Sequence, residues 1–287
     1  GDDAAAAARR QRAAAAGAIE AVVAALRAHA QVEGVQEYCC GALFNVCSGD
    51  DAAGAARKQR AAAAGAIEKV VAALRAHAQV VCVQEYGCGA LVNVCSGDDA
   101  AAAARRQRAA AAGAIEEVVA ALRAHPQEEG VQEDGCRALA IVCFGDDAAA
   151  AARRQRAAAA GAIEKVVEAL RAHAQVECVQ EYGCEALACV CNGDDAAAAA
   201  LKQRAAAAGA IEKVVAALRA HPQEEDVQEY GCGALANVCS GDDAAAAARR
   251  QRAATAGAIE AVAAALRAHP QEEDMQKDGC RVLAIVC

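Results

Sequence analysis

The tripeptide Gly-Asp-Asp returns every 48 residues along this chain, and this period constrains the fold more than any other feature. Six copies of one repeat therefore fill the 287 residues. The repeats are 1–48, 49–96, 97–144, 145–192, 193–240 and 241–287. A tandem array of this kind is typical of a solenoid, in which each unit packs against its neighbours only. We expect a single solenoid domain over residues 1–287.

The composition supports thin layers rather than one thick core. Hydrophobic residues make up 56% of the chain, but aromatic residues make up only 2% and most of the apolar total is alanine. The formal charge of −9 disfavours nucleic acid or an anionic membrane surface as a partner. There is no run of about 18 large apolar residues, so we expect no membrane span. The chain opens on Gly1 without a signal-peptide pattern, and we expect a processed chain or a fragment.

Each repeat predicts three helices, as the second repeat illustrates. An alanine-rich stretch after Asp51 predicts the first helix, with the basic residues Arg57–Arg60 closing it, where they suit the helix dipole. The apolar residues of 67–74 fall at i, i+3, i+4 and i+7, which predicts an amphipathic second helix that ends near His77. A third apolar stripe over 83–95 predicts the last helix, which stops at a Ser-Gly pair.

Two segments of the repeat resemble the armadillo repeat family. They are Gly65-Ala66-Ile67-Glu68 and the stretch Val83-Gln84-Glu85 followed by Ala90-Leu91-Val92-Asn93-Val94-Cys95-Ser96. The first matches the family's opening to its second helix, and the other matches the ending of its third helix. The resemblance implies an all-α fold, a right-handed solenoid of six 48-residue three-helix repeats. HEAT repeats, with two helices per unit, are the nearest rival.

The armadillo resemblance also implies a binding face. In that family the third helices line a concave groove, where an Asn grips the backbone of an extended peptide and a Trp four residues earlier walls a side-chain pocket. The Asn is kept in three of six repeats here, whereas no repeat keeps the Trp, so nuclear-localisation-type binding and transport-receptor activity do not carry over. The candidate protein-binding residues are Asn45, Asn93, Asn237, Glu37, Tyr38, Glu85, Tyr86, Asp134, Arg137, Tyr182, Glu185 and Tyr230.

This predicted face is acidic, with four Tyr as its only rings, so we expect a partner of basic or polar character. The third and sixth repeats differ from the others, because Asp replaces Tyr and Arg follows three residues later. We expect Asp134–Arg137 and Asp278–Arg281 to form i, i+3 pairs on the helix surface.

Twelve of the 16 cysteines occupy two positions per repeat, seven residues apart on the predicted third helix. That spacing is about 10 Å along a helix, which is too far for a disulfide. We therefore expect buried thiols in a reducing compartment, the cytoplasm, with Cys82 and Cys178 as the most exposed. The spacing also lacks the paired ligands of a zinc site. The patterned cysteines are Cys40, Cys88, Cys136, Cys184, Cys232, Cys280, Cys47, Cys95, Cys143, Cys191, Cys239 and Cys287.

The six histidines share one repeat position, where we expect them to bond the carbonyls at the end of the second helix. No acid or nucleophile stands at a fixed offset from them, so we expect no catalytic, cofactor-binding or metal-binding residues and no enzyme. The basic residues of each first helix are interpreted as a solvated stripe that pairs with the Asp-Asp of each repeat. Phosphate binding is the alternative for this stripe.

These observations favour a non-enzymatic scaffold that binds a protein or extended peptide along the concave face. A structural subunit that docks by its ends or ridges within a large assembly is the first alternative. A nucleic-acid-binding solenoid that uses the basic stripe is the second.

Overall fold

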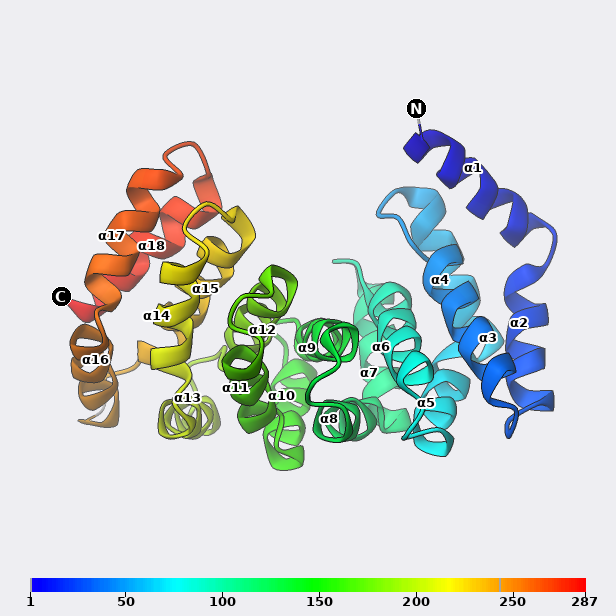
Figure 1. The fold of residues 1–287 in the computed structure, drawn as a ribbon, viewed down its shortest axis with the longest axis horizontal. Coiled ribbons are helices and arrows are strands. Elements are labelled where there is room, and N and C mark those ends of the chain that lie inside the picture. The colour runs from blue at the N-terminus through cyan, green and yellow to red at the C-terminus, as the bar shows by residue number, and fades with distance from the viewer. Residues whose placement is uncertain (1, 243) are drawn as a thin grey trace. The chain divides into compact units, whose positions relative to one another are not determined.

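The computed structural model describes residues 2–242 and 244–287, and the chain divides into two compact units, Gly1–Val142 and Cys143–Cys287. The described residues form eighteen α-helices in six successive triplets (Figure 1). The prediction of an all-α fold with three helices per repeat is therefore confirmed. That all six repeats make a single domain stays a prediction.

Each unit is built from repeated triplets. In the first unit the helices are α1 (Asp2–Ala15), α2 (Ala18–Ala28), α3 (Glu33–Val46), α4 (Ala52–Ala64), α5 (Ala66–Ala76), α6 (Val81–Cys95), α7 (Ala100–Ala112), α8 (Ala114–Ala124) and α9 (Glu129–Cys143), the last ending at the boundary. In the second unit they are α10 (Ala148–Ala160), α11 (Ala162–Ala172), α12 (Glu177–Val190), α13 (Ala196–Ala208), α14 (Ala210–Ala220), α15 (Glu225–Cys239), α16 (Ala244–Ala256), α17 (Ala258–Ala268) and α18 (Glu273–Val286).

The ends of each first helix follow from its sequence. The Asp51 side chain caps α4 by accepting a hydrogen bond of 2.7 Å from the Gly54 N–H. Gly65, with a φ of 90°, adopts the left-handed conformation that lets α4 stop and α5 start. The basic residues lie in the middle of α4 rather than at its end, because alanines continue the helix to Ala64. The predicted complement to the helix dipole was therefore wrong.

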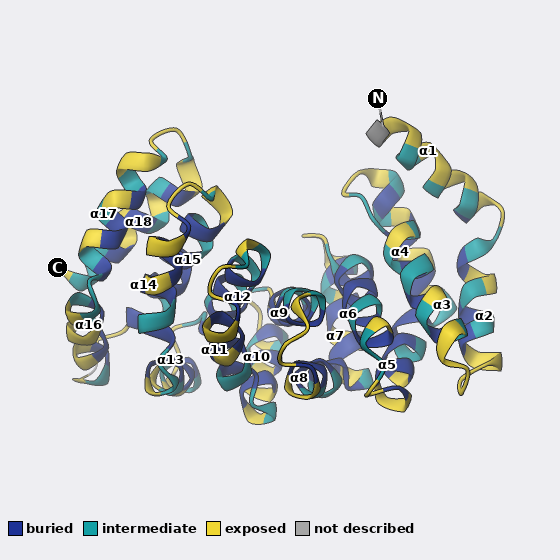
Figure 2. Cartoon of the chain, in the orientation of Figure 1, coloured by how far each residue is buried: buried dark blue, intermediate teal, exposed yellow. Residues whose placement is uncertain are grey.

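The second helices supply the large side chains of the core. The stripe of apolar residues on α5 is buried as predicted, with Ile67 and Leu74 each 1% exposed. A Cβ placed on Gly87 would lie 2.6 Å from Leu74 Cδ2, so the glycine allows α6 to approach α5 closely. Buried positions line the faces between helices, and exposed positions gather on the outer faces and turns (Figure 2).

Successive repeats pack through their third helices, which lie side by side within each unit. In the described residues α3 packs along α6, α12 along α15, and α15 along α18. Each unit has such a layer, which we call the third-helix face of that unit. It is formed by α3, α6 and α9 in the first unit and by α12, α15 and α18 in the second.

The first basic residue of α4, α7, α10 and α16 is buried, and it joins two repeats. Arg105 is 3% exposed, and its Nε donates to the Val94 carbonyl at 2.7 Å and its Nη2 to the Ser96 carbonyl at 2.9 Å. These carbonyls end α6 and need donors from outside that helix. Arg57 and Arg249 make the equivalent bonds in their repeats. The solvated stripe inferred from the sequence is therefore wrong at this position.

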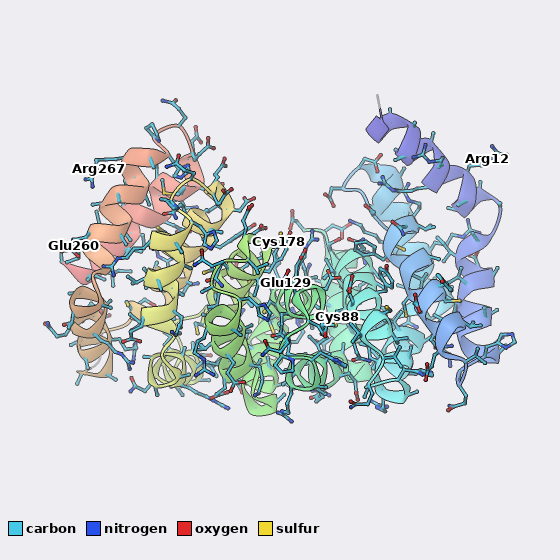
Figure 3. The ribbon with its side chains drawn as sticks, in the orientation of Figure 1. Arg12, Cys88, Glu129, Cys178, Glu260 and Arg267 are labelled. Carbon is cyan, nitrogen blue, oxygen red and sulfur yellow. The ribbon has the colours of Figure 1, made fainter. Side chains whose placement is uncertain are left out.

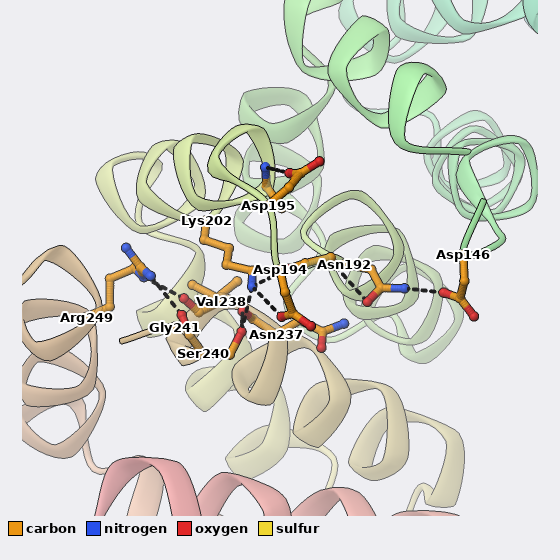
Figure 4. Close-up of polar contacts among 12 residues, drawn as sticks. Asp146, Asn192, Asp194, Asp195, Lys202, Asn237, Val238, Ser240, Gly241 and Arg249 are labelled. Carbon is orange, nitrogen blue, oxygen red and sulfur yellow. Dashed lines mark hydrogen bonds and ion pairs between the residues drawn. The ribbon is translucent and has the colours of Figure 1, made fainter. Parts of the chain in front are cut away.

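The other two basic residues of the triplet also bond within the fold. Lys202, which is 3% exposed, donates to the Gly193 carbonyl at 2.6 Å and to Ser240 Oγ at 2.7 Å (Figure 4). Arg60, the third residue, donates to both carboxylate oxygens of Glu20 in the preceding repeat, with Nη2···Oε2 at 2.8 Å. The same pairing recurs at Arg108–Glu68, Arg204–Glu164 and Arg252–Glu212.

The histidines are structural, as predicted, but their partners lie one repeat away. His77 Nε2 lies 2.8 Å from the carbonyl oxygen of Ala30 in the preceding repeat, and His125 is placed equally against Ala78. A buried glutamine caps the second helix instead. Gln84 Nε2 donates to the carbonyls of Leu74 and His77, both at 3.0 Å. This glutamine recurs in every repeat, which is the sequence signal for its structural role.

Candidate protein-binding face

The structure places the predicted binding residues on the third helices of the two units. In the first unit α3 carries Glu37, Tyr38 and Asn45, α6 carries Glu85, Tyr86 and Asn93, and α9 carries Asp134 and Arg137. In the second unit α12 carries Tyr182 and Glu185, and α15 carries Tyr230 and Asn237. Figure 3 shows the side chains along these helices. Whether they bind a partner stays a prediction.

The asparagines at the position of the family's peptide-binding Asn already have partners inside the fold. Asn93 Nδ2 donates to the Phe44 carbonyl of the preceding repeat at 2.6 Å, and it thereby links α6 to α3. Asn45 Nδ2 donates instead to the Gly41 carbonyl of its own helix at 2.9 Å. A peptide backbone would therefore have to compete with the Phe44 carbonyl for the Asn93 amide.

Neighbouring side chains fill the space above the glycines that stand at the family's Trp position in the first unit. A Cβ on Gly41 would meet the Tyr86 ring at 3.7 Å. A Cβ on Gly89 would lie 2.8 Å from the Phe44 ring and 2.9 Å from the Asp134 carboxylate. Each third helix thus covers part of the preceding one. Tyr38, at the position on α3 equivalent to that of Tyr86, is 75% exposed.

Asp134 makes the first unit's face electrostatically unusual. Burial raises the pKa of Asp134 to about 7, and the nearby carboxylates of Glu133 and Glu85 raise it further, while Arg137 acts in the opposite direction. Burial also raises the pKa of Glu133. The predicted neighbourhood of Asp134 and Arg137 is thus present, but one cation does not offset the burial of the carboxylate.

The predicted ion pair between Asp278 and Arg281 is present in the second unit. Arg281 Nη1 lies 3.7 Å from Asp278 Oδ1 on α18, and Arg281 Nη2 donates to Asn237 Oδ1 at 2.8 Å. Asn237 Nδ2 in turn donates to the Ala188 carbonyl at 2.8 Å. One polar chain therefore crosses α18, α15 and α12, and it engages both ends of the Asn237 amide.

A hollow of about 300 Å³ opens on the third-helix face of the second unit, beside this polar chain. The predicted residues Glu185, Tyr230 and Asn237 line it. Phe144, which is 44% exposed and lies just before Gly145, also lines it and was missed by the sequence analysis. A signal was available, because the chain holds only two Phe and this one replaces the Ser or Asn found before the other internal Gly-Asp-Asp tripeptides.

The cysteines are free thiols in the described structure, and most patterned ones are buried as predicted. Burial raises the pKa of Cys136 to about 12, which makes that thiol a poor nucleophile. Cys82 is exposed as predicted, but Cys178, at the start of α12, is only half-buried (Figure 3). The prediction was wrong for Cys280 and Cys287, which are exposed.

Among residues 2–242 and 244–287, no group of three or more His, Cys, Asp or Glu side chains is placed to hold a metal ion. Within the same residues, none of the helices combines the length and apolarity needed to cross a membrane.

Three helices per repeat, stacked through the third helix, define the fold as an armadillo-type solenoid. Among the solved structures it matches is an armadillo-repeat chain of beta-catenin, from work on a phosphorylation switch that controls the interaction between cadherin and beta-catenin. The TM-score is 0.77 at 16% sequence identity, and the match covers 97% of this chain and 47% of that one. The chain thus spans about half the length of the solved chain. No family model and no curated protein matches the sequence.

Proposed function

We propose that this chain is a non-enzymatic scaffold that binds a protein or an extended peptide along its third-helix face. The likeness of the fold to a chain whose interaction with cadherin has been studied supports a protein partner. The carboxylates along the face favour a partner of basic or polar character. The free cysteines support a reducing compartment, which we take to be the cytoplasm.

The observation that carries this proposal is open surface with aromatic side chains on the third helices. The hollow of about 300 Å³ lies on the third-helix face of the second unit, where Tyr230 and Glu185 line it. In the first unit the Tyr38 ring on α3 is 75% exposed. Aromatic side chains that offer an apolar ring and a hydroxyl are enriched at protein interfaces. An exposed tyrosine beside carboxylates is therefore suited to a partner surface.

Binding of nucleic acid through the first helices is less well supported. Arg57, Arg105 and Arg249 are each 3% exposed or less, because their guanidinium groups bond helix-end carbonyls. A phosphate backbone could reach them only after those bonds broke. The basic residues therefore serve the stacking of repeats.

The test is capture of a partner from extract of the source organism, followed by variants of the face. Tyr38→Ala should weaken capture at least about tenfold, since interface aromatics often contribute more than about 1.4 kcal/mol. Arg27→Gln, at an exposed position on α2, is the matched control and should leave capture unchanged. An Asn45→Ala/Asn93→Ala double variant should also lose affinity, by about 1–3 kcal/mol per peptide bond partner left unpaired. It needs a melting curve beside it, because the Asn93 amide also joins two repeats.

If all face variants capture the partner as well as the unmodified chain does, the proposal fails. A partner that is lost instead on substitution at the ends or ridges of the repeats would support the alternative, a structural subunit of a larger assembly.

A further inference from the structure

The hollow on the third-helix face of the second unit opens where the repeat carries a small residue and not the ring found in the first repeat. Four repeats carry alanine at this position. Ala188 occupies the repeat position that Phe44 occupies three repeats earlier, and Gly233 corresponds in the same way to Gly89. The Phe44 ring comes within 2.8 Å of a Cβ placed on Gly89, whereas on Gly233 the nearest atoms are an Asp278 carboxylate oxygen at 3.2 Å and Ala188 Cβ at 3.9 Å. The open space is thus a sequence-encoded difference between equivalent positions.

The residues that line the hollow combine rings with a carboxylate. Ala188 and Gly233 are among its smallest lining residues. Tyr230 and Phe144 supply aromatic side chains, and Glu229 on α15 supplies a half-buried carboxylate. Aromatic rings attract cations placed over their faces, and a carboxylate accepts two parallel bonds from a guanidinium group. This set of groups therefore suits a flat cation on an apolar stem.

Carboxylates outnumber cations among the residues that line the hollow, with Asp146, Glu185, Glu229 and Asp278 against Arg154 and Arg281. Burial raises the pKa of Glu229 first, and the carboxylates of Asp274, Asp226, Asp278 and Glu225 raise it further. Burial also raises the pKa of Tyr230, and the carboxylates of Glu185, Glu229, Asp226 and Glu181 raise it further.

The two basic residues that line the hollow already bond other lining residues. Arg154 donates to the Gly145 carbonyl at 2.6 Å, and Arg281 bonds Asn237 and Asp278. A cation supplied by a partner would therefore enter a negative region and complete its charge balance.

We infer that this hollow binds the side chain of an arginine of the partner, with its stem against Tyr230 and Phe144 and its guanidinium group at Glu229. The inference rests on the proposed function, since the arginine belongs to a protein that occupies the third-helix face. Arginine is preferred to lysine because its planar group can stack on a ring while it donates to a carboxylate.

The probe is N-acetyl-arginine-methylamide, and the neutral isostere N-acetyl-citrulline-methylamide is its control. Binding to the full chain is followed by NMR of ¹³C-methyl alanines, which include Ala188. We expect the arginine probe to bind at millimolar concentration and the citrulline probe to bind at least about tenfold more weakly, the loss typical of one charge-assisted bond.

Two variants locate the probe. Ala188→Phe should close the hollow, in the way the Phe44 ring fills the equivalent space, and should abolish the arginine preference. Glu229→Gln removes the charge without changing the size of the side chain, and it tests the site if Ala188→Phe disturbs the fold. Glu177→Gln, an equal change of charge at an exposed position on α12, should leave the preference intact.

The inference is overturned if the two probes bind equally, if neither binds, or if the preference survives both variants. The same variants in the partner-capture assay separate this failure from failure of the proposed function. If capture still depends on Tyr38 while the probes show no preference, only the hollow's assignment is lost. If the arginine preference is present but capture ignores every face variant, the proposed function is lost instead.

Discussion

Replacement of Asp134 by Asn should remove a pH dependence from the stability of the first unit. The pKa of Asp134 is about 7 in the folded chain against an ordinary value of 3.8, so between these values the folded state binds more protons than the unfolded state. The free energy of unfolding therefore falls as pH rises through this window. Over pH 5 to 8 the loss has a ceiling of about 3 kcal/mol, since each pH unit of difference is about 1.4 kcal/mol.

The assay is urea unfolding at pH 5 and pH 8, followed by circular dichroism, with a ¹³C-carboxyl NMR titration of Asp134 beside it. The unmodified chain should unfold at lower urea at pH 8 in its first-unit transition. Asp134→Asn should show less of this loss and be the more stable of the two at pH 8, because its side chain stays neutral. A carboxyl that titrates near pH 4, or an equal loss in both proteins, would refute the argument that Asp134 is buried without sufficient compensation.

Three further changes test the packing and the thiols. Leu122→Ala, at a position 2% exposed in the first unit, should cost about 2–5 kcal/mol and separate the unfolding of that unit from the other, whereas one transition with an unchanged midpoint would show that Leu122 is not core. Arg108→Met removes the bonds to Glu68 and should lower the free energy of unfolding by about 1 kcal/mol, and Arg27→Met should have no effect in the same urea titration. Thiol labelling of the native chain, read by mass spectrometry, should be fast at the exposed cysteines and slow at the buried ones, and fast labelling of Cys136 would contradict its burial. The expected fast set is Cys82, Cys280 and Cys287.

The sequence was sufficient for the helices because each of them is specified locally. The signals that specify the helices act within one repeat. They are the alanine-rich stretches, an Asp cap, a left-handed Gly65 and the apolar stripe of 67–74, and they recur with the 48-residue period. The packing of one repeat on the next was less accessible. Arg105 looks like a surface residue in the sequence, and only the position of the α6 carbonyls shows why it is buried.

The candidate face shows the same division. Periodicity and the armadillo resemblance were sufficient to assign Tyr38, Asn93 and Tyr230 to third helices, because that depends on the position within a repeat. They could not indicate that Asn93 would bond the Phe44 carbonyl, since that bond joins residues 49 apart in the sequence. Periodicity and the resemblance also could not locate the hollow, because it depends on the small side chain of Ala188 and on how three helices pack around it.

The central claim is that the third-helix face holds the partner, and hydrogen exchange with the native partner bound tests it most directly. Backbone amides on α3, α6, α12 and α15 should gain the most protection on binding. Amides of the first helices, such as α4 and α13, should keep the exchange rates that they have without the partner. Protection that falls instead on the first helices, or only on the outer surfaces of the first and sixth repeats, would contradict the account.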